Sequence, residues 1–358
     1  MIRIPKLNSA RLLAAVFLAA IFAAPNARAQ AQSPGPAQIV LPSRLVASQP
    51  ATLAVLDNVG RLVPKVNLTL SDGTPIETDA TGRAFFTAPS APGVLIARVA
   101  GHHEIAAASV ILPFAKSDKT QIDWTPTQIS IHDRFDVRGS GFRGDAAGNT
   151  AQLGHQAALV LAASPASLVL LLDPAAAPGT AQLSVTANGS EAVAILAALS
   201  IEFDTNGVTL VPGSKAALTV RVRGTDQSKE MDVENLAPAV LRFAHGDSEH
   251  VRTKGGVDNS ALINVRAMHS GDFSFRVRLT STDPNSVDVG AAHAYLLAAQ
   301  KIAPAQLTWR LDPLLARLEQ KKPDTRKIQQ DLIHLQTKSA PENVVFLINA
   351  AKDSLEPR

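Results

Sequence analysis

The chain has 358 residues, a formal net charge of +3 and no cysteine. Without cysteine it can form no disulfide, thiolate zinc site, iron–sulfur cluster or lipid anchor on a cysteine. A chain of this length exceeds one ordinary hydrophobic core, so two or three domains are expected.

The first 29 residues have the pattern of a secretory signal peptide. Basic residues precede an apolar run at 12–24, and Ala27 and Ala29 supply the small residues of a cleavage site. The run is shorter than the roughly 20 residues that span a bilayer. Removal of residues 1–29 would leave 30 basic and 31 acidic groups. We therefore predict a nearly neutral protein of the bacterial periplasm or cell surface, with no nucleic-acid partner and no membrane span after cleavage.

A first antiparallel domain is predicted at 39–113, after a Gln/Ser/Pro/Gly linker at 30–38. Val66, Leu68 and Leu70 alternate with polar residues, which is the period of a half-buried strand. Asp72-Gly73 follows as a hairpin turn.

The segment TDATGRAFFTAPSAPGVLIARVAG, at 78–101, has a T-D-x-x-G-x-A turn that leads into two strands across a P-G loop. It resembles the end of a bacterial immunoglobulin-like domain. The resemblance implies a β-sandwich that serves as a spacer or binding module.

A second domain is predicted at 124–198. FDVRGSGF, at 135–142, and AQLSVTANG, at 181–189, alternate apolar and polar residues and end in turns. The order of strand, G-S-G-F, polar loop, apolar run and A-P-G-T-A-Q-L-S-V resembles the IPT/TIG domain, an immunoglobulin-like fold. The resemblance implies a sandwich module of extracellular bacterial proteins, where members act as spacers, in adhesion or in carbohydrate binding.

The segment 199–282 repeats this alternation and predicts a third immunoglobulin-like sandwich. Its two arginine pairs, Arg221/Arg223 and Arg276/Arg278, point outward from their strands. If the two strands are neighbours, they form a basic stripe that could face an anionic glycan or lipopolysaccharide. The alternative is ordinary protection of sheet edges by charged side chains, which we favour.

The C-terminal segment 287–358 predicts a small helical module. We expect one helix at 291–302, a helix start at Asp312-Pro313, and a capping box at 339–342. Apolar stripes on these helices could dock on the third sandwich or on a partner protein. Docking within the chain is favoured, because short helices gain most of their stability from packing.

Gly139, Gly141 and Gly144 have the G-x-G-x-x-G spacing of a nucleotide-phosphate loop. That loop requires a helix directly after it, and residues 145–149, DAAGN, lead into another strand instead. The preceding strand also alternates, whereas a buried parallel strand would be continuously apolar. We interpret the glycines as a turn and predict that no helix begins at Gly144.

Other candidate sites are weak. The segment HGDSEH, at 245–250, offers two histidines and two carboxylates but reads as a solvated loop. His102 and His103 point to opposite faces of an extended strand. Ser140 lacks the frame of a nucleophile elbow. Glu77 and Asp79 share one face of a polar strand, without any sign of a cleft. No catalytic, cofactor-binding or metal residue is assigned, and no cofactor is expected.

The fold class is therefore mainly β: tandem immunoglobulin-like β-sandwiches with a small C-terminal α-helical module. Trp124 and Trp309, the two tryptophans, are expected to be packing residues. We interpret the chain as a secreted, non-enzymatic binding, adhesion or scaffold protein of the bacterial envelope, with an unidentified protein or glycan partner and unknown ligand-binding residues. One alternative is an accessory carbohydrate-binding protein of a polysaccharide-processing system, and another is a hydrolase with an interdomain site.

Overall fold

The computed structural model describes residues 35–115, 117, 119–204, 210–271, 273–280, 286–335, 337 and 340–357. The predicted signal peptide and most of the predicted linker lie outside these residues. The described chain is mainly β, with immunoglobulin-like β-sandwiches followed by C-terminal helices. The predicted fold class is confirmed.

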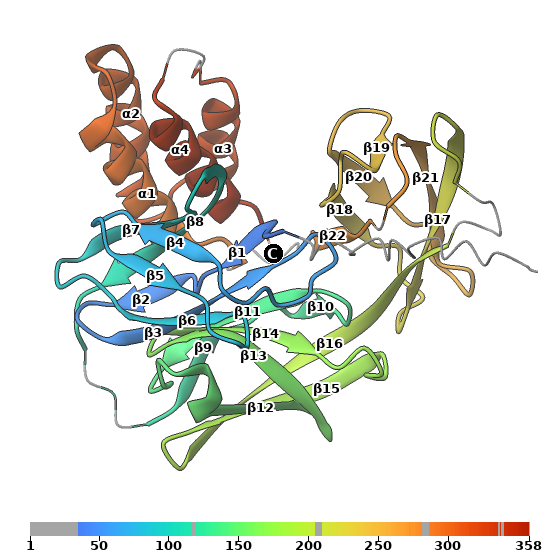
Figure 1. The fold of residues 1–358 in the computed structure, drawn as a ribbon, viewed down its shortest axis with the longest axis horizontal. Coiled ribbons are helices and arrows are strands. Elements are labelled where there is room, and N and C mark those ends of the chain that lie inside the picture. The colour runs from blue at the N-terminus through green and yellow to red at the C-terminus, as the bar shows by residue number, and fades with distance from the viewer. Residues whose placement is uncertain are drawn as a thin grey trace, which may run out of the picture. The chain divides into compact units, whose positions relative to one another are not determined.

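In the first sandwich, two sheets face each other across one core (Figure 1). One sheet contains β1 (Gln38–Val40), β3 (Pro50–Leu56) and β6 (Arg83–Thr87). The other contains β2 (Arg44–Val46), β8 (His102–Leu112), β7 (Gly93–Val99), β4 (Asn67–Leu70) and β5 (Pro75–Glu77). Strand β2 runs parallel to β8, and the remaining pairs are antiparallel. Alternate residues of these strands, such as Leu53, Leu68 and Leu95, fill the core because successive side chains point to opposite faces.

The second sandwich has the same organisation. The strands β9 (Gln121–Trp124), β11 (Arg134–Ser140) and β14 (Ser167–Leu172) form one layer. The strands β10 (Gln128–Ser130), β16 (Ser190–Asp204), β15 (Gly179–Ala187) and β12 (Asn149–Leu153) form the other. Strand β13 (Gln156–Ser164) pairs with β12 at its start and with β14 along the rest, which joins the two layers. Its register shift between Val160 and Ala162 lets one strand serve both sheets.

The third sandwich begins on the same strand that ends the second. Strand β16 pairs with β15 up to Ala198 and with β17 (Lys215–Arg223) from Ser200 onward (Figure 1). Strands β21 (Ser260–Ala267) and β19 (Leu241–Phe243) complete that sheet. The facing sheet has the order β20 (Ser248–Arg252), β18 (Glu230–Asn235) and β22 (Phe275–Leu279). No flexible linker separates the second and third cores along this strand.

The loop that carries the three glycines packs the second sandwich against the first. A Cβ on Gly144 would lie 2.0 Å from the carbonyl oxygen of Pro50 on β3. Thr52, also on β3, donates a hydrogen bond to the carbonyl oxygen of Gly144 at 2.7 Å. A Cβ on Gly139 would lie 1.9 Å from the carbonyl oxygen of Gln121. The glycines are thus required by close backbone approach, which is a use of glycine unrelated to phosphate binding.

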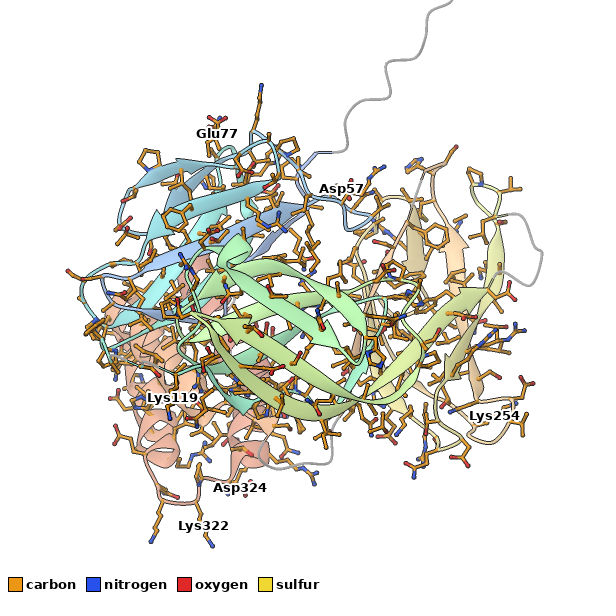
Figure 2. The ribbon with its side chains drawn as sticks, turned by 90° about the horizontal axis from the view of Figure 1, so that it is seen from below. Asp57, Glu77, Lys119, Lys254, Lys322 and Asp324 are labelled. Atoms are coloured by element: carbon orange, nitrogen blue, oxygen red, sulfur yellow. The ribbon has the colours of Figure 1, made fainter. Side chains whose placement is uncertain are left out.

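Four helices follow in the described part of the chain: α1 (Val289–Ile302), α2 (Ala305–Leu318), α3 (Thr325–Ile333) and α4 (Glu342–Ser354). They pack against β7 and β8 of the first sandwich (Figure 1). Tyr295 of α1 donates a hydrogen bond to the carbonyl oxygen of Ala108 on β8 at 3.2 Å. The loop between α2 and α3, with Lys322 and Asp324, lies at the outer end of the helices (Figure 2). The helical module therefore docks within the chain, and its main partner is the first sandwich and not the third.

Two predicted helix boundaries differ from the structure. Pro313 does not start a helix but lies inside α2. Proline in a helix interior costs about 3 kcal/mol. The stripe of buried leucines on α2 runs through this position and offsets the cost, since each buried leucine contributes about 2 kcal/mol: Leu307, Leu311, Leu314, Leu315 and Leu318. Helix α4 begins at Glu342 after Pro341, which makes no side-chain cap, and part of the predicted capping box lies outside the described residues.

None of the helices in the described part of the chain is both long and apolar enough to cross a membrane.

Candidate functional site

A cavity of about 300 Å³ lies where the first two sandwiches, strand β22 and helices α1 and α4 meet. Its walls include residues of β1 and β8, together with Trp124 and Tyr295. Seven charged side chains line the rest of the wall. They are Arg134, Arg138, Arg276, Arg278, Asp136, Asp288 and Asp353. We call this site the arginine-lined cavity.

Asp288 ties three parts of the fold together at one edge of the cavity. As the N-cap residue of α1, it accepts a hydrogen bond from the backbone amide of Ala291 at 3.0 Å. Its carboxylate also forms ion pairs with Arg44 on β2, at 2.9 Å, and with Arg138 on β11. Burial raises the pKa of Asp288, but the two arginines outweigh burial and hold the pKa below its ordinary value.

Arg138 is the most enclosed arginine of the wall, with 8% of its side chain exposed. Its guanidinium carbon lies 3.6 Å from the centre of the Trp124 ring, which is a cation–π contact. Burial lowers the pKa of Arg138, and Asp288 counteracts that shift. The Nε atom of Arg138 is buried and has no hydrogen-bond partner. Asp288 therefore fixes the position of Arg138, while the Nε donor of Arg138 stays without a partner.

Arg276 and Arg278 project from β22 and share one carboxylate. Glu234 on β18 lies 3.9 Å from Arg276 and 3.5 Å from Arg278. Arg278 also approaches Asp353, at 3.9 Å, and a second carboxylate near the end of α4. Arg276 has the weaker pairing. Burial, together with the charges of Arg134 and Arg278, lowers the pKa of Arg276 to about 9. It remains protonated at neutral pH.

Arg134 on β11 has no ion-pair partner within 4.0 Å among the described residues. The neighbouring carboxylate of Asp133 is engaged by the backbone instead. It accepts hydrogen bonds from the amide of Arg134, at 2.7 Å, and from the amide of Val277 on β22, at 3.0 Å. Burial lowers the pKa of Arg134, and the charges of Asp133, Asp136 and Glu234 counteract the shift. Arg134 and Arg276 are thus the least neutralised cations of the wall.

A second cavity of about 90 Å³ is lined in part by the same residues. The two cavities share a wall made of Trp124, Arg134, Asp136, Arg276 and Arg278. This shared wall contains an aromatic ring, a carboxylate and three guanidinium groups, of which Arg134 has no ion-pair partner among the described residues and Arg276 has a long one. Such a set can bind an oxyanion together with a ring that carries hydroxyl groups.

The glycine loop lacks the helix that follows the glycines in a nucleotide-phosphate loop. No α-helix begins at Gly144, as predicted, and only a short 3₁₀ turn, Ala146–Gly148, follows it. The Asp145 side chain accepts a hydrogen bond from the backbone amide of Ala147 at that turn.

The histidine-rich segment forms separate pairs rather than one cluster. His245 lies 3.3 Å from Glu249, and His250 lies 2.9 Å from Asp232. Over the described residues, no group of three His, Cys, Asp or Glu side chains could hold a metal ion. Elsewhere, Asp79 accepts hydrogen bonds from Thr81 in its turn.

The two arginine pairs of the third sandwich do not form one stripe, because β17 and β22 belong to different sheets. Arg221 pairs with Asp204 at 3.4 Å, and Arg223 pairs with Glu202 at 3.2 Å. Arg276 and Arg278 line the cavity instead. Trp309 was expected to pack but is 64% exposed on α2.

Sequence reasoning missed Arg134, Asp136 and Arg138 as site residues. The signal was present in RFDVR, at 134–138, where two apolar residues alternate with three charged ones. That alternation places all three charged side chains on the outer face of β11. Only contacts between distant segments turn this face into a cavity wall.

Comparison with protein-family models gives no match, and neither does comparison with curated proteins. Several solved structures match at low similarity. The plexin A4 extracellular region is 9% identical with a TM-score of 0.26, over 67% of this chain and 32% of that chain. The SGBP-B of a mixed-linkage glucan utilization locus from Bacteroides ovatus is 10% identical with a TM-score of 0.20, over 68% of this chain and 60% of that chain.

A second SGBP-B, from a complex xyloglucan utilization locus in Bacteroides uniformis, is 11% identical with a TM-score of 0.23, over 69% of this chain and 100% of that chain. The chain thus spans about a third of plexin A4 and 60% of the Bacteroides ovatus protein. At identities and TM-scores this low, the matches carry no argument about function.

Proposed function

We propose that the chain is a secreted, non-enzymatic binding and scaffold protein of the bacterial envelope, and that it contacts its ligand in the arginine-lined cavity. The observation that carries the proposal is the cavity itself. It lies where the sandwiches and helices meet, and it holds guanidinium groups that the described residues do not fully neutralise. The proposed secretion rests on the signal-peptide pattern at 1–29.

The frame around the cavity supports a binding role because it is cross-linked by contacts between distant segments. Asp288 joins α1 to Arg44 and Arg138. An apolar cluster joins the outer faces of the first two sandwiches, with Leu56, Leu161 and Val169 among its members. A preorganised frame lowers the entropy cost of binding.

A second candidate is an accessory carbohydrate-binding protein, and Trp124 favours it. This tryptophan lines both cavities beside the charged groups. An aromatic ring buries a large area at low entropy cost and leaves its edge free for polar contacts. Under this candidate the envelope partner is a glycan.

The test compares residues 30–358 with two tryptophan variants on a glycan array and in pull-downs from envelope extract. Asn349 of α4 is exposed and lines the cavity, so Asn349→Trp should fill it without disturbing the core. Gln306→Trp, at an exposed position of α2 outside the cavity lining, is the matched control. We expect Asn349→Trp to abolish a binding signal that Gln306→Trp retains. Equal binding by all three proteins, or no binding by the unmodified protein, would refute the proposal.

A further inference from the structure

The strongest unassigned feature of the cavity is its incomplete charge balance. Two of the three aspartates in its wall are already engaged, Asp288 with Arg44 and Arg138, and Asp353 with Arg278. Among the described residues, Arg276 has Glu234 as its one ion-pair partner, at 3.9 Å, and shares it with Arg278. A partly buried guanidinium without a close counter-ion is unfavourable in the empty protein.

Arg134 and Arg276 form the under-neutralised part of the wall. The carboxylate next to Arg134, that of Asp133, accepts hydrogen bonds from backbone amides. The carboxylate that pairs with Arg276, that of Glu234, is 3.9 Å away. The two side chains come from different sandwiches, on β11 and β22, and line the same two cavities. An oxyanion between them would accept charge-assisted hydrogen bonds from both guanidinium groups.

Two arginines of the same wall contain buried donors without partners. The Nε atoms of Arg138 and Arg278 are buried and have no hydrogen-bond partner among the described residues. Buried donors without partners are rare in native proteins, because each lost hydrogen bond is costly. These Nε atoms are buried, so they are not open to a ligand in the cavity and add to the cost of the empty wall.

The wall also offers features that a simple anion would not use. Asp136 forms no hydrogen bond or ion pair with the described residues, so its carboxylate can accept hydrogen bonds from hydroxyl groups. Trp124 lines the same cavity, with Arg138 over one face of its ring. The volume of about 300 Å³ is at the small end of ligand pockets, which suits one or two rings and not a long polymer segment.

We infer that the arginine-lined cavity binds an anionic sugar unit, with its carboxylate or phosphate between Arg134 and Arg276, its hydroxyl groups on Asp136 and its ring against Trp124. The inference rests on the proposed function and names the class of ligand for that same site. The oxyanion provides the affinity, and the hydroxyl contacts provide the discrimination against small inorganic anions.

The test uses tryptophan fluorescence of residues 30–358 carrying Trp309→Phe, so that Trp124 is the only tryptophan. The probes are glucuronate, glucose 6-phosphate, glucose, acetate and inorganic phosphate. We expect at least one anionic sugar to change the fluorescence with a dissociation constant on the order of 1 mM or below, and glucose, acetate and phosphate each to bind at least about tenfold more weakly. The carboxylate and phosphate arms identify which oxyanion is preferred.

Variants locate the site. Arg134→Gln and Arg276→Gln should each weaken binding by roughly 10- to 100-fold, because each removes a charged hydrogen bond. Asp136→Asn should reduce the preference for the anionic sugar over its bare anion. Arg252→Gln, on β20 of the same sheet as β22 and 72% exposed, is the control and should bind normally.

The possible failures can be separated. Equal binding of phosphate or acetate means an adventitious anion only and overturns the inference, as does equal binding of glucose or no binding of any anionic sugar. If those results accompany a glycan-array or pull-down signal that Asn349→Trp abolishes, the proposed function survives without this ligand class. If that signal is also absent, both proposals fail.

Discussion

Asp288, the N-cap residue of α1, forms an ion pair with Arg138 of β11, 150 positions earlier in the chain. The pair connects the helical module to the second sandwich at the edge of the arginine-lined cavity. It also holds Arg138 over the ring of Trp124. The geometry of the proposed site therefore depends on this contact, and the contact can be tested apart from any ligand.

Asp288→Asn should lower the free energy of unfolding by about 3 kcal/mol at neutral pH. Asparagine keeps the helix cap, but the substitution leaves the buried Arg138 without its counter-ion. The folded-state pKa of Asp288 is lowered below 3.8, so its stabilising contribution is present above that pH and is lost as the pH falls through the folded-state value. Urea unfolding from pH 7 to pH 3 should show the difference from the unmodified protein shrinking below about pH 4. A difference that stays constant over this range would contradict the assigned ion pairs.

Gly144→Ala should destabilise the protein by about 1–3 kcal/mol, because the new Cβ would overlap the carbonyl oxygen of Pro50. Gly290→Ala is a matched control on α1, where the nearest atom to a new Cβ is 3.6 Å away and alanine favours the helix. The control should raise stability slightly. Thermal unfolding of both variants measures the effect, and an unchanged midpoint for Gly144→Ala would show that the two sandwiches do not approach so closely.

Deletion of residues 287–358 should lower the melting temperature and expose the apolar outer face of β7 and β8. Val94, Ile96 and Val110 on that face pack against the helices. An environment-sensitive apolar dye should bind the truncated protein and not the full chain. Unchanged thermal stability together with no dye binding would contradict docking of the helices within the chain.

Arg276→Gln and Arg138→Gln should have opposite effects on the empty protein. Arg276 is weakly paired, so glutamine should leave the melting temperature unchanged or raise it. Arg138 pairs with Asp288 and stacks on Trp124, so its loss should cost about 2–3 kcal/mol. Thermal denaturation without ligand distinguishes the two arginines. A large loss of stability for Arg276→Gln would assign it a structural role.

Local alternation predicted the strands well because it reports the two faces of each strand directly. Val66, Leu68 and Leu70 are buried as expected. The IPT/TIG resemblance remains a prediction, as do the domain limits that were proposed from it.

The cavity could not be predicted in the same way. The alternation in RFDVR predicts that Arg134 and Arg138 lie on the strand face away from the core of their own sandwich. It does not predict that residues of β22 and α1 will line a cavity with them. Pro313 shows the same limit, since a local rule expected a helix start where tertiary packing continues a helix. Local sequence patterns predict which face of a strand is buried and where a helix ends. A site between modules depends on contacts between residues that are far apart in the chain.

A crystal structure of residues 30–358 grown with glucuronate or glucose 6-phosphate tests the proposed site most directly. We expect density for the sugar in the arginine-lined cavity, with its oxyanion contacting Arg134 and Arg276 and its ring beside Trp124. Density for the sugar elsewhere on the protein, or a cavity that contains only water at saturating ligand, would contradict it.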